Sequence, residues 1–123
     1  MGAWSYEVLS NDRALDTMWD LVDSKNLKED IIKLIENGDT DEKVLACEIV
    51  DISINGIDEE ILGGLYEHED FFEKIQNDPI TDLRLKAFET IRYVQKHDGG
   101  WIDEVKGQRV DLLRKIENRL ITD

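Results

Sequence analysis

The chain has 123 residues, of which 41% are hydrophobic and 36% are charged, and its net charge is −14. This length suits one small domain, and the apolar residues are spread too evenly along it for a disordered chain. The negative charge argues against nucleic acids and membranes as partners, since proteins bind these polyanions with clusters of Lys and Arg.

The acidic residues concentrate in the first half of the chain. Residues 1–60 hold 16 acids and 5 bases, a net charge of −11, whereas residues 61–123 hold 13 acids and 10 bases, a net charge of −3. Such a charge distribution attracts a basic partner toward the first half. General solubility is the alternative explanation for an acidic composition.

The sequence shows neither the basic and apolar segments of a signal peptide nor a run of about 18 apolar residues that would predict a membrane span. Its single cysteine, Cys47, cannot form an internal disulfide. We therefore expect a cytoplasmic protein in which Cys47 is a buried thiol.

An aromatic-rich arm over residues 1–10 leads into the first expected helix, for which Ser10 or Asn11 is a suitable N-cap. Large apolar residues recur at helical spacing and predict its buried face: Leu15, Met18, Trp19 and Val22. Four aspartates lie off that face and form an acidic ridge: Asp12, Asp16, Asp20 and Asp23. The ridge is either a docking surface or the solvated back of the helix.

The second helix is expected over about residues 27–36, with Asn26 as its cap and Asn37-Gly38 as a left-handed stop. Its inward residues are Leu27, Ile31, Leu34 and Ile35. A third helix is expected after the cap Thr40, ending at Asn55-Gly56. It is apolar around much of its circumference, which predicts the centre of the core, with inward residues Val44, Leu45, Ala46, Ile49, Val50 and Ile52.

Residues 58–77 predict either one interrupted helix or two short ones, beginning at the cap Asp58 and burying Phe71, Phe72 and Ile75. Asp78-Pro79 then predicts the cap and first residue of a helix that reaches about His97. The expected buried residues of that helix are Leu83, Ala87, Phe88, Ile91 and Val94.

After a turn at residues 98–100, Trp101 is expected to fold back on the core, and the last helix should span about residues 105–121. Its apolar face is Leu112, Leu113, Ile116 and Leu120. Its basic residues are Lys106, Arg109, Arg114, Lys115 and Arg119, and this positive face suits the acidic first half.

These elements predict an all-α protein: a single domain over residues 1–123, built as a compact bundle of five to seven helices and preceded by an extended arm. Residues 40–48 resemble residues 81–89 at an offset of 41 positions, which lies in the range of helical repeats. Two stacked helical hairpins with capping helices are therefore an alternative architecture, and chance similarity is the other explanation.

No set of residues has both the types and the spacing of a known chemistry. His68 and His97 lack the spacing of metal ligands, and Cys47 lies mid-helix rather than at a helix start that stabilises a thiolate. The glycine pairs 63–64 and 99–100 lack the pattern of a phosphate-binding loop. The sequence therefore predicts no catalytic residue, no cofactor and no metal.

The opening residues Met1-Gly2-Ala3-Trp4, followed by Asn11-Asp12 and Ala14-Leu15-Asp16, resemble the start of the bacterial domain of unknown function 4259 family, M-G-A/T-W-G-x-G-x-F-x-N-D-x-A-x-D. Residues 46–50 are similar to that family's A-x-E-V-V helix, and Trp101 with residues 109–120 is similar to its closing segment. Ser5, Glu7 and Leu9 stand where the family has Gly, Gly and Phe, so the chain resembles a divergent member. The resemblance implies a small, mainly helical protein and no known activity.

The junction of arm and helix, with Trp4, Asn11, Asp12 and Asp16, is either a functional surface or a structural motif. The structural interpretation is favoured, with Trp4 buried and Asn11 beginning the helix. We expect a non-enzymatic protein-binding module, immunity- or antitoxin-like, that docks a basic protein through its acidic first half. The alternative is a small-molecule-binding protein or hydrolase with a site at Trp4, Asp12 and Asp16. A structural, oligomer-forming protein is a third hypothesis, and the oligomeric state is left open.

Overall fold

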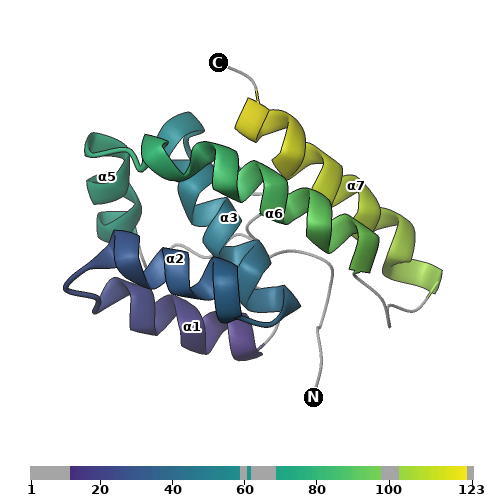
Figure 1. Cartoon of the computed structure of the whole chain (residues 1–123), viewed down its shortest axis with the longest axis horizontal. Helices are drawn as coiled ribbons and strands as arrows, with labels where there is room; N and C mark the ends of the chain where they lie inside the picture. The colour runs from purple at the N-terminus through teal and green to yellow at the C-terminus, as the bar shows by residue number, and fades with distance from the viewer. Residues whose placement is uncertain (1–11, 59–60, 62–68, 98–102, 122–123) are drawn as a thin grey trace.

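The computed structural model describes residues 12–58, 61, 69–97 and 103–121, and these form an all-α bundle without strands (Figure 1). The helices are α1 (Asp12–Val22), α2 (Leu27–Asn37), α3 (Thr40–Asn55), α5 (Glu69–Asn77), α6 (Arg84–His97) and α7 (Asp103–Ile121), with a 3-10 turn η1 (Thr81–Leu83) before α6. The predicted fold class is confirmed. The arm, the side chains of Asn11 and Asp12, and the predicted turn with Trp101 lie outside the described residues.

Helix α3 is the centre of the bundle, as its sequence predicts. Every residue from Val44 to Ser53 is buried, and α1, α2, α5, α6, α7 and η1 all pack against this helix. Figure 1 shows α6 and α7 as an antiparallel pair along one side of α3, with α1 and α2 on another. The surrounding helices therefore share one core, to which each contributes an apolar face.

The start of α3 is fixed one residue earlier than expected. Asp39, not Thr40, is the N-cap: its side chain accepts from the Glu42 amide at 2.9 Å, while the Glu42 carboxylate accepts from the Asp39 amide at 3.0 Å. This reciprocal capping box satisfies two amides of the first turn, which a lone Thr cap would not. The predicted stop is confirmed, because Gly56 adopts a φ of 87°.

The predicted left-handed stop at Asn37-Gly38 is wrong, although Asn26 caps α2 as predicted and accepts from the Glu29 amide. Gly38 has a φ of −72° and a ψ of 165°, an extended conformation that any residue can adopt. A side chain is excluded by space instead: an added Cβ would lie 2.6 Å from the Leu34 carbonyl oxygen and 2.9 Å from the Glu42 Cβ. Glycine at this corner permits the close approach of α2 and α3.

The start of the helix after α5 also differs from the prediction. Asp78 and Pro79 lie before the helix, and the chain passes through η1 before α6 begins at Arg84. Ile80 is buried, and its amide donates to the Ser53 hydroxyl on α3 at 3.0 Å. This contact holds Ile80 against the core at a φ of −90° and a ψ of 59°, which is not a helical conformation, so the helix begins later. Of residues 58–77, the structure describes Asp58, the buried Ile61 and α5, so the choice between one helix and two stays open.

The similar segments 40–48 and 81–89 both begin helical turns, at α3 and at η1. Helices α2 and α3 form a packed hairpin, whereas α6 pairs with α7 and α5 packs mainly on α3. In the described part of the chain, the second of the two predicted hairpins is therefore not formed by α5 and α6.

Candidate functional site

The acidic ridge lies on the face of α1 opposite the core. Asp16, Asp20 and Asp23 are exposed, as predicted. Asp23 follows the last residue of α1, and its amide still bonds to the Trp19 carbonyl, so it continues the helical path. At 100° per residue the three carboxylates fall within roughly 60° of the helix circumference. They form one continuous row of negative charge.

The predicted burial of Trp19 is wrong: 51% of this residue is exposed. The core face of α1 consists of Ala14, Thr17, Met18 and Leu21, while Leu15 and Val22 lie at its edge. This face is rotated from the predicted one by roughly 100°, about one residue. The small Ala14 and Thr17 allow α1 to approach the bundle, whereas a pattern weighted by large side chains selects Trp19.

The rotation places Trp19 beside the acidic ridge. Trp19 lies three residues after Asp16 and four before Asp23, and residues at these spacings share a helix face. An exposed indole among carboxylates offers apolar contact area next to negative charge. Trp19 therefore borders the described part of the acidic ridge, which is Asp16, Asp20 and Asp23.

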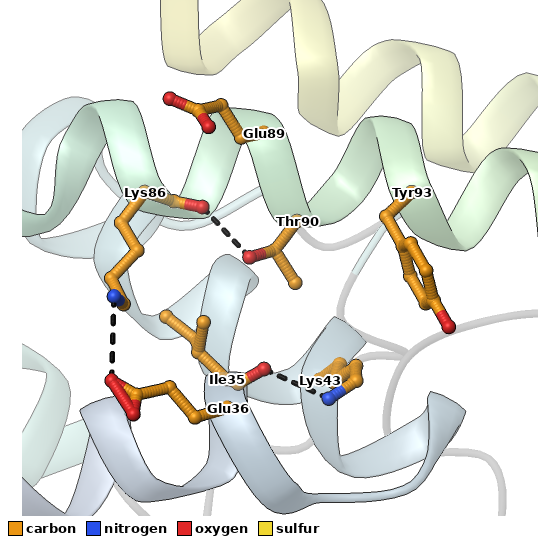
Figure 2. A pocket seen from close by; sticks show the side chains of 7 residues that line it. All are labelled: Ile35, Glu36, Lys43, Lys86, Glu89, Thr90 and Tyr93. Carbon is orange, nitrogen blue, oxygen red and sulfur yellow. Dashed lines mark hydrogen bonds and ion pairs between the residues drawn. The ribbon is translucent and has the colours of Figure 1, made fainter.

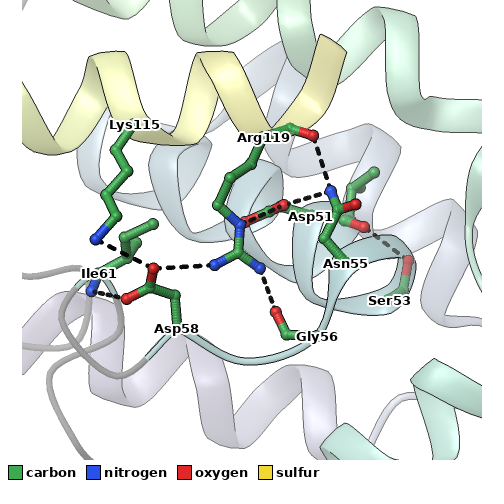
Figure 3. Close-up of polar contacts among 9 residues, drawn as sticks. Asp51, Ser53, Asn55, Gly56, Asp58, Ile61, Lys115 and Arg119 are labelled. Atoms are coloured by element: carbon green, nitrogen blue, oxygen red, sulfur yellow. Dashed lines mark hydrogen bonds and ion pairs between the residues drawn. The ribbon is translucent and has the colours of Figure 1, made fainter. Parts of the chain in front are cut away.

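A second set of charges lies inside the bundle, where α7 meets the end of α3 (Figure 3). The Arg119 guanidinium contacts both carboxylate oxygens of Asp51, at 3.1 and 3.0 Å from Nε, and Asp58 at 3.2 Å from Nη1. Its Nη2 also donates to the Gly56 carbonyl. Lys115 contacts the same Asp58 carboxylate at 3.2 Å.

Backbone groups complete this network. The side-chain amide of Asn55 donates to Asp51 at 2.9 Å and to the backbone carbonyl of Arg119 at 2.8 Å. Asp58 accepts from the backbone amide of Ile61 at 3.3 Å. On the same helix α7, the buried Arg109 lies 3.8 Å from Asp41. The predicted pairing of the basic last helix with the acidic first half is therefore confirmed, and it serves to attach α7 to α3.

Glu48 was not predicted as a site residue, yet it is fully buried in the middle of α3, one turn before Asp51. Burial first, and then repulsion from Asp51, raise the pKa of Glu48 well above its ordinary value, while Arg119 opposes the shift. The sequence held a signal for this position, because a helix predicted to be covered on several sides must bury its acids as well.

Three cavities bordered by described residues are lined by none of Asp16, Asp20 and Asp23. One, of about 440 Å³, lies between η1, α6 and the end of α7. Another, of about 400 Å³, is bordered by α2, the start of α3 and α6 (Figure 2). Its polar groups bind one another: Lys86 contacts Glu36 at 3.4 Å, and Lys43 donates to the Ile35 carbonyl at 2.8 Å. These contacts join three helices, which is a structural role.

The largest of these cavities, of about 650 Å³, separates the α1–α2 corner from the α5–η1 corner. Leu21, Phe71, Ile75 and Ile80 form much of its apolar lining. Its charged residues are three lysines, Lys25, Lys28 and Lys74, and three aspartates, Asp70, Asp78 and Asp82. Lys28 bridges to Asp82 and lowers the pKa of that carboxyl. Because both signs are equally represented, the cavity favours neither anions nor cations.

The cysteine and the histidines were the other candidate site residues in the sequence. Cys47 is buried as predicted, donates to the Ala87 carbonyl at 3.4 Å, and has its pKa raised chiefly by burial. His97 ends α6 and lies against Tyr93, while His68 lies outside the described residues. Among the described residues, no cluster of His, Cys, Asp or Glu could hold a metal ion, and no helix is long and apolar enough to cross a membrane.

The fold and these two charged regions define a small all-α protein with a charged network inside and an acidic ridge outside. A family model described as Domain of unknown function (DUF4259) matches residues 2–107. The chain therefore belongs to the DUF4259 family, and the resemblance found in its sequence is confirmed. Comparisons with curated proteins and with solved structures gave no match.

Proposed function

We propose that this protein is a non-enzymatic binding module that docks a basic protein through the acidic ridge of α1. The observation that carries the proposal is the arrangement of Asp16, Asp20 and Asp23 around a half-exposed Trp19 on one helix face. Carboxylates steer a basic partner and set its orientation, while a tryptophan supplies the apolar contact area typical of binding hot spots.

The position of the ridge supports this function. Asp20 and Asp23 lie at the C-terminal end of α1, and the last turn of this helix carries no basic residue. Negative charge at this end opposes the helix dipole, and Asp16 repels Asp20 at an i, i+4 spacing. Folding stability therefore does not account for these aspartates, whereas a basic partner does.

An immunity- or antitoxin-like role fits this chemistry, because occluding a basic nuclease or another toxin requires a complementary surface and no catalysis. The overall net charge of −14 strengthens the attraction at long range. The alternative of a small-molecule or hydrolase site at the arm–helix junction gains no support from Asp16, which is exposed on the outer face of α1.

A charge-matched comparison tests the proposal. A basic protein captured by the chain is purified, and its Kd is measured for the triple variant Asp16→Asn, Asp20→Asn, Asp23→Asn and for a control, Glu73→Gln, Glu89→Gln, Asp111→Asn. The control removes the same charge from exposed positions on α5, α6 and α7. We expect the ridge variant to weaken binding roughly tenfold or more, and the control much less.

Two further measurements complete the test. Trp19→Ala should weaken binding by about 2 kcal/mol if the indole is a hot spot. Binding should also weaken steeply as the salt concentration rises, because exposed charges are screened. An affinity that ignores salt, or an equal loss in the two triple variants, would exclude the ridge as the docking surface.

A further inference from the structure

Glu48 is the most deeply buried acid without a hydrogen-bond donor in the part of the chain that the structure describes. Its side chain is completely buried, and neither of its carboxyl oxygens has a hydrogen-bond donor among the described residues. Taking a lone carboxylate out of water costs several kcal/mol, and a buried acid without a cation partner avoids this cost by binding a proton. The geometry alone therefore favours the neutral form.

The charges around Glu48 point the same way. Asp51 follows one turn later on α3, Asp58 lies beyond the helix end, and α7 contributes Arg119 and Lys115. The helices α1, α2, α5 and α6 bury no charged side chain in the part of the chain that the structure describes. Helix α7 also holds the buried base Arg109, which contacts Asp41 at the start of α3. Apart from that pair, three acids face two bases, and the cluster becomes neutral when one of the three acids is protonated.

The hydrogen bonds show which acid takes the proton. Asp51 accepts from Arg119 and Asn55, and Asp58 accepts from the Ile61 amide and contacts both bases. These donors favour ionised carboxylates. Glu48 has no such donor, and the Asp51 carboxylate one turn later repels a second negative charge, so Glu48 is the acid best placed to take the proton.

We propose that Glu48 carries a proton at neutral pH and donates it to Asp51, forming a neutral cluster that attaches α7 and the residues after α3 to the core. The attachment is a proton-dependent latch. When Glu48 loses its proton at higher pH, the cluster keeps an uncompensated negative charge, and the Arg119 contacts with Asp51 and Asp58 weaken under repulsion from Glu48.

The sign of the pH dependence follows from the raised pKa. In the unfolded chain Glu48 titrates near its ordinary value of 4.5, and in the folded chain it titrates at a higher pH. The folded state therefore binds more protons between these two values. Its stability contribution is complete below pH 4.5 and falls as the pH rises through the folded pKa, by up to about tenfold in the folding equilibrium per pH unit.

The test compares the full chain with Glu48→Gln, which copies the protonated side chain but cannot ionise. Urea unfolding is measured between about pH 5 and pH 8. The folding equilibrium constant of Glu48→Gln divided by that of the wild type should rise with pH by up to about tenfold per unit. Glu73→Gln, an exposed change on α5, should show a much smaller pH-dependent change.

A direct measurement does not depend on the stability of a variant. In wild-type protein with 13C-labelled glutamate carboxyls, one carboxyl should have the chemical shift of a protonated acid at neutral pH, and its signal should vanish in Glu48→Gln. A ratio of folding constants that stays level with pH would overturn the proposal. So would a Glu48 carboxyl signal with the shift of an ionised group at pH 7.

Discussion

Helices α1 and α3 both carry acids at helical spacing, but the fold treats them in opposite ways. Asp51 on α3 is buried against Arg119, whereas Asp16, Asp20 and Asp23 on α1 face solvent on an element whose last turn lacks a base. The interior acids attach one helix to another, while the exterior ones oppose the stability of their own helix. Acids of the same type therefore take a structural role or, as we propose, a docking role, according to where the cations of the fold lie.

The largest expected effect comes from removing the cation of the interior network. Arg119→Met retains a long apolar side chain but leaves Asp51 and Asp58 without the guanidinium that contacts both. A buried charge without its partner costs about 3–5 kcal/mol, and we expect a loss of this size in the free energy of unfolding measured with urea.

Arg114→Met is the matched control, since Arg114 is exposed on the same helix α7. Its effect should stay within about 0.5 kcal/mol. If the two variants were equally stable, the interior network would stabilise the fold no more than a surface ion pair does. The structural role given to the acids of α3, in contrast to those of α1, would then be wrong.

A second pair of variants tests whether the free energy of unfolding is also sensitive to close packing around α3. Gly38→Ala places a Cβ 2.9 Å from the Glu42 Cβ on α3 and 2.6 Å from the Leu34 carbonyl oxygen on α2, so the corner between the two helices must open. We expect a loss of about 1–3 kcal/mol in urea unfolding. Gly107 lies on α7, and a Cβ added there would have no neighbouring atom within 4 Å. Because alanine favours a helix more than glycine does, Gly107→Ala should instead raise the free energy of unfolding by up to about 1 kcal/mol. Losses of equal size at both positions would contradict the close approach seen at the corner.

The central helix was predictable from the sequence because burial on all sides leaves an apolar run that no other element shows. The end of α3 was equally clear, since Gly56 adopts a positive φ, which glycine tolerates and other residues rarely adopt. The start was missed although the sequence holds a signal for it: Glu42 lies three residues after Asp39, the spacing of a capping box, whereas Thr40 has Lys43 at that position.

The candidate sites also include features that the sequence predicts and features that depend on contacts between helices. The exposure of Asp16, Asp20 and Asp23 follows from helical spacing alone. That of Trp19 does not, because the rotation of α1 is set by how closely Ala14 and Thr17 approach the core. The proton of Glu48 depends on which charges α7 brings to α3, and those contacts join residues far apart in the chain.

The smallest expected effect on stability belongs to the ridge itself. Asp20→Asn removes a like-charge contact with Asp16 and a charge that opposes the helix dipole, so unfolding in urea at low salt should become harder by a few tenths of a kcal/mol. The gain should fade at high salt, since exposed charges are screened. The same change should weaken the proposed partner's binding. A variant that gains stability and loses affinity would show that α1 keeps its aspartates for docking; a loss of stability would instead give Asp20 a structural role, as the interior acids of α3 have.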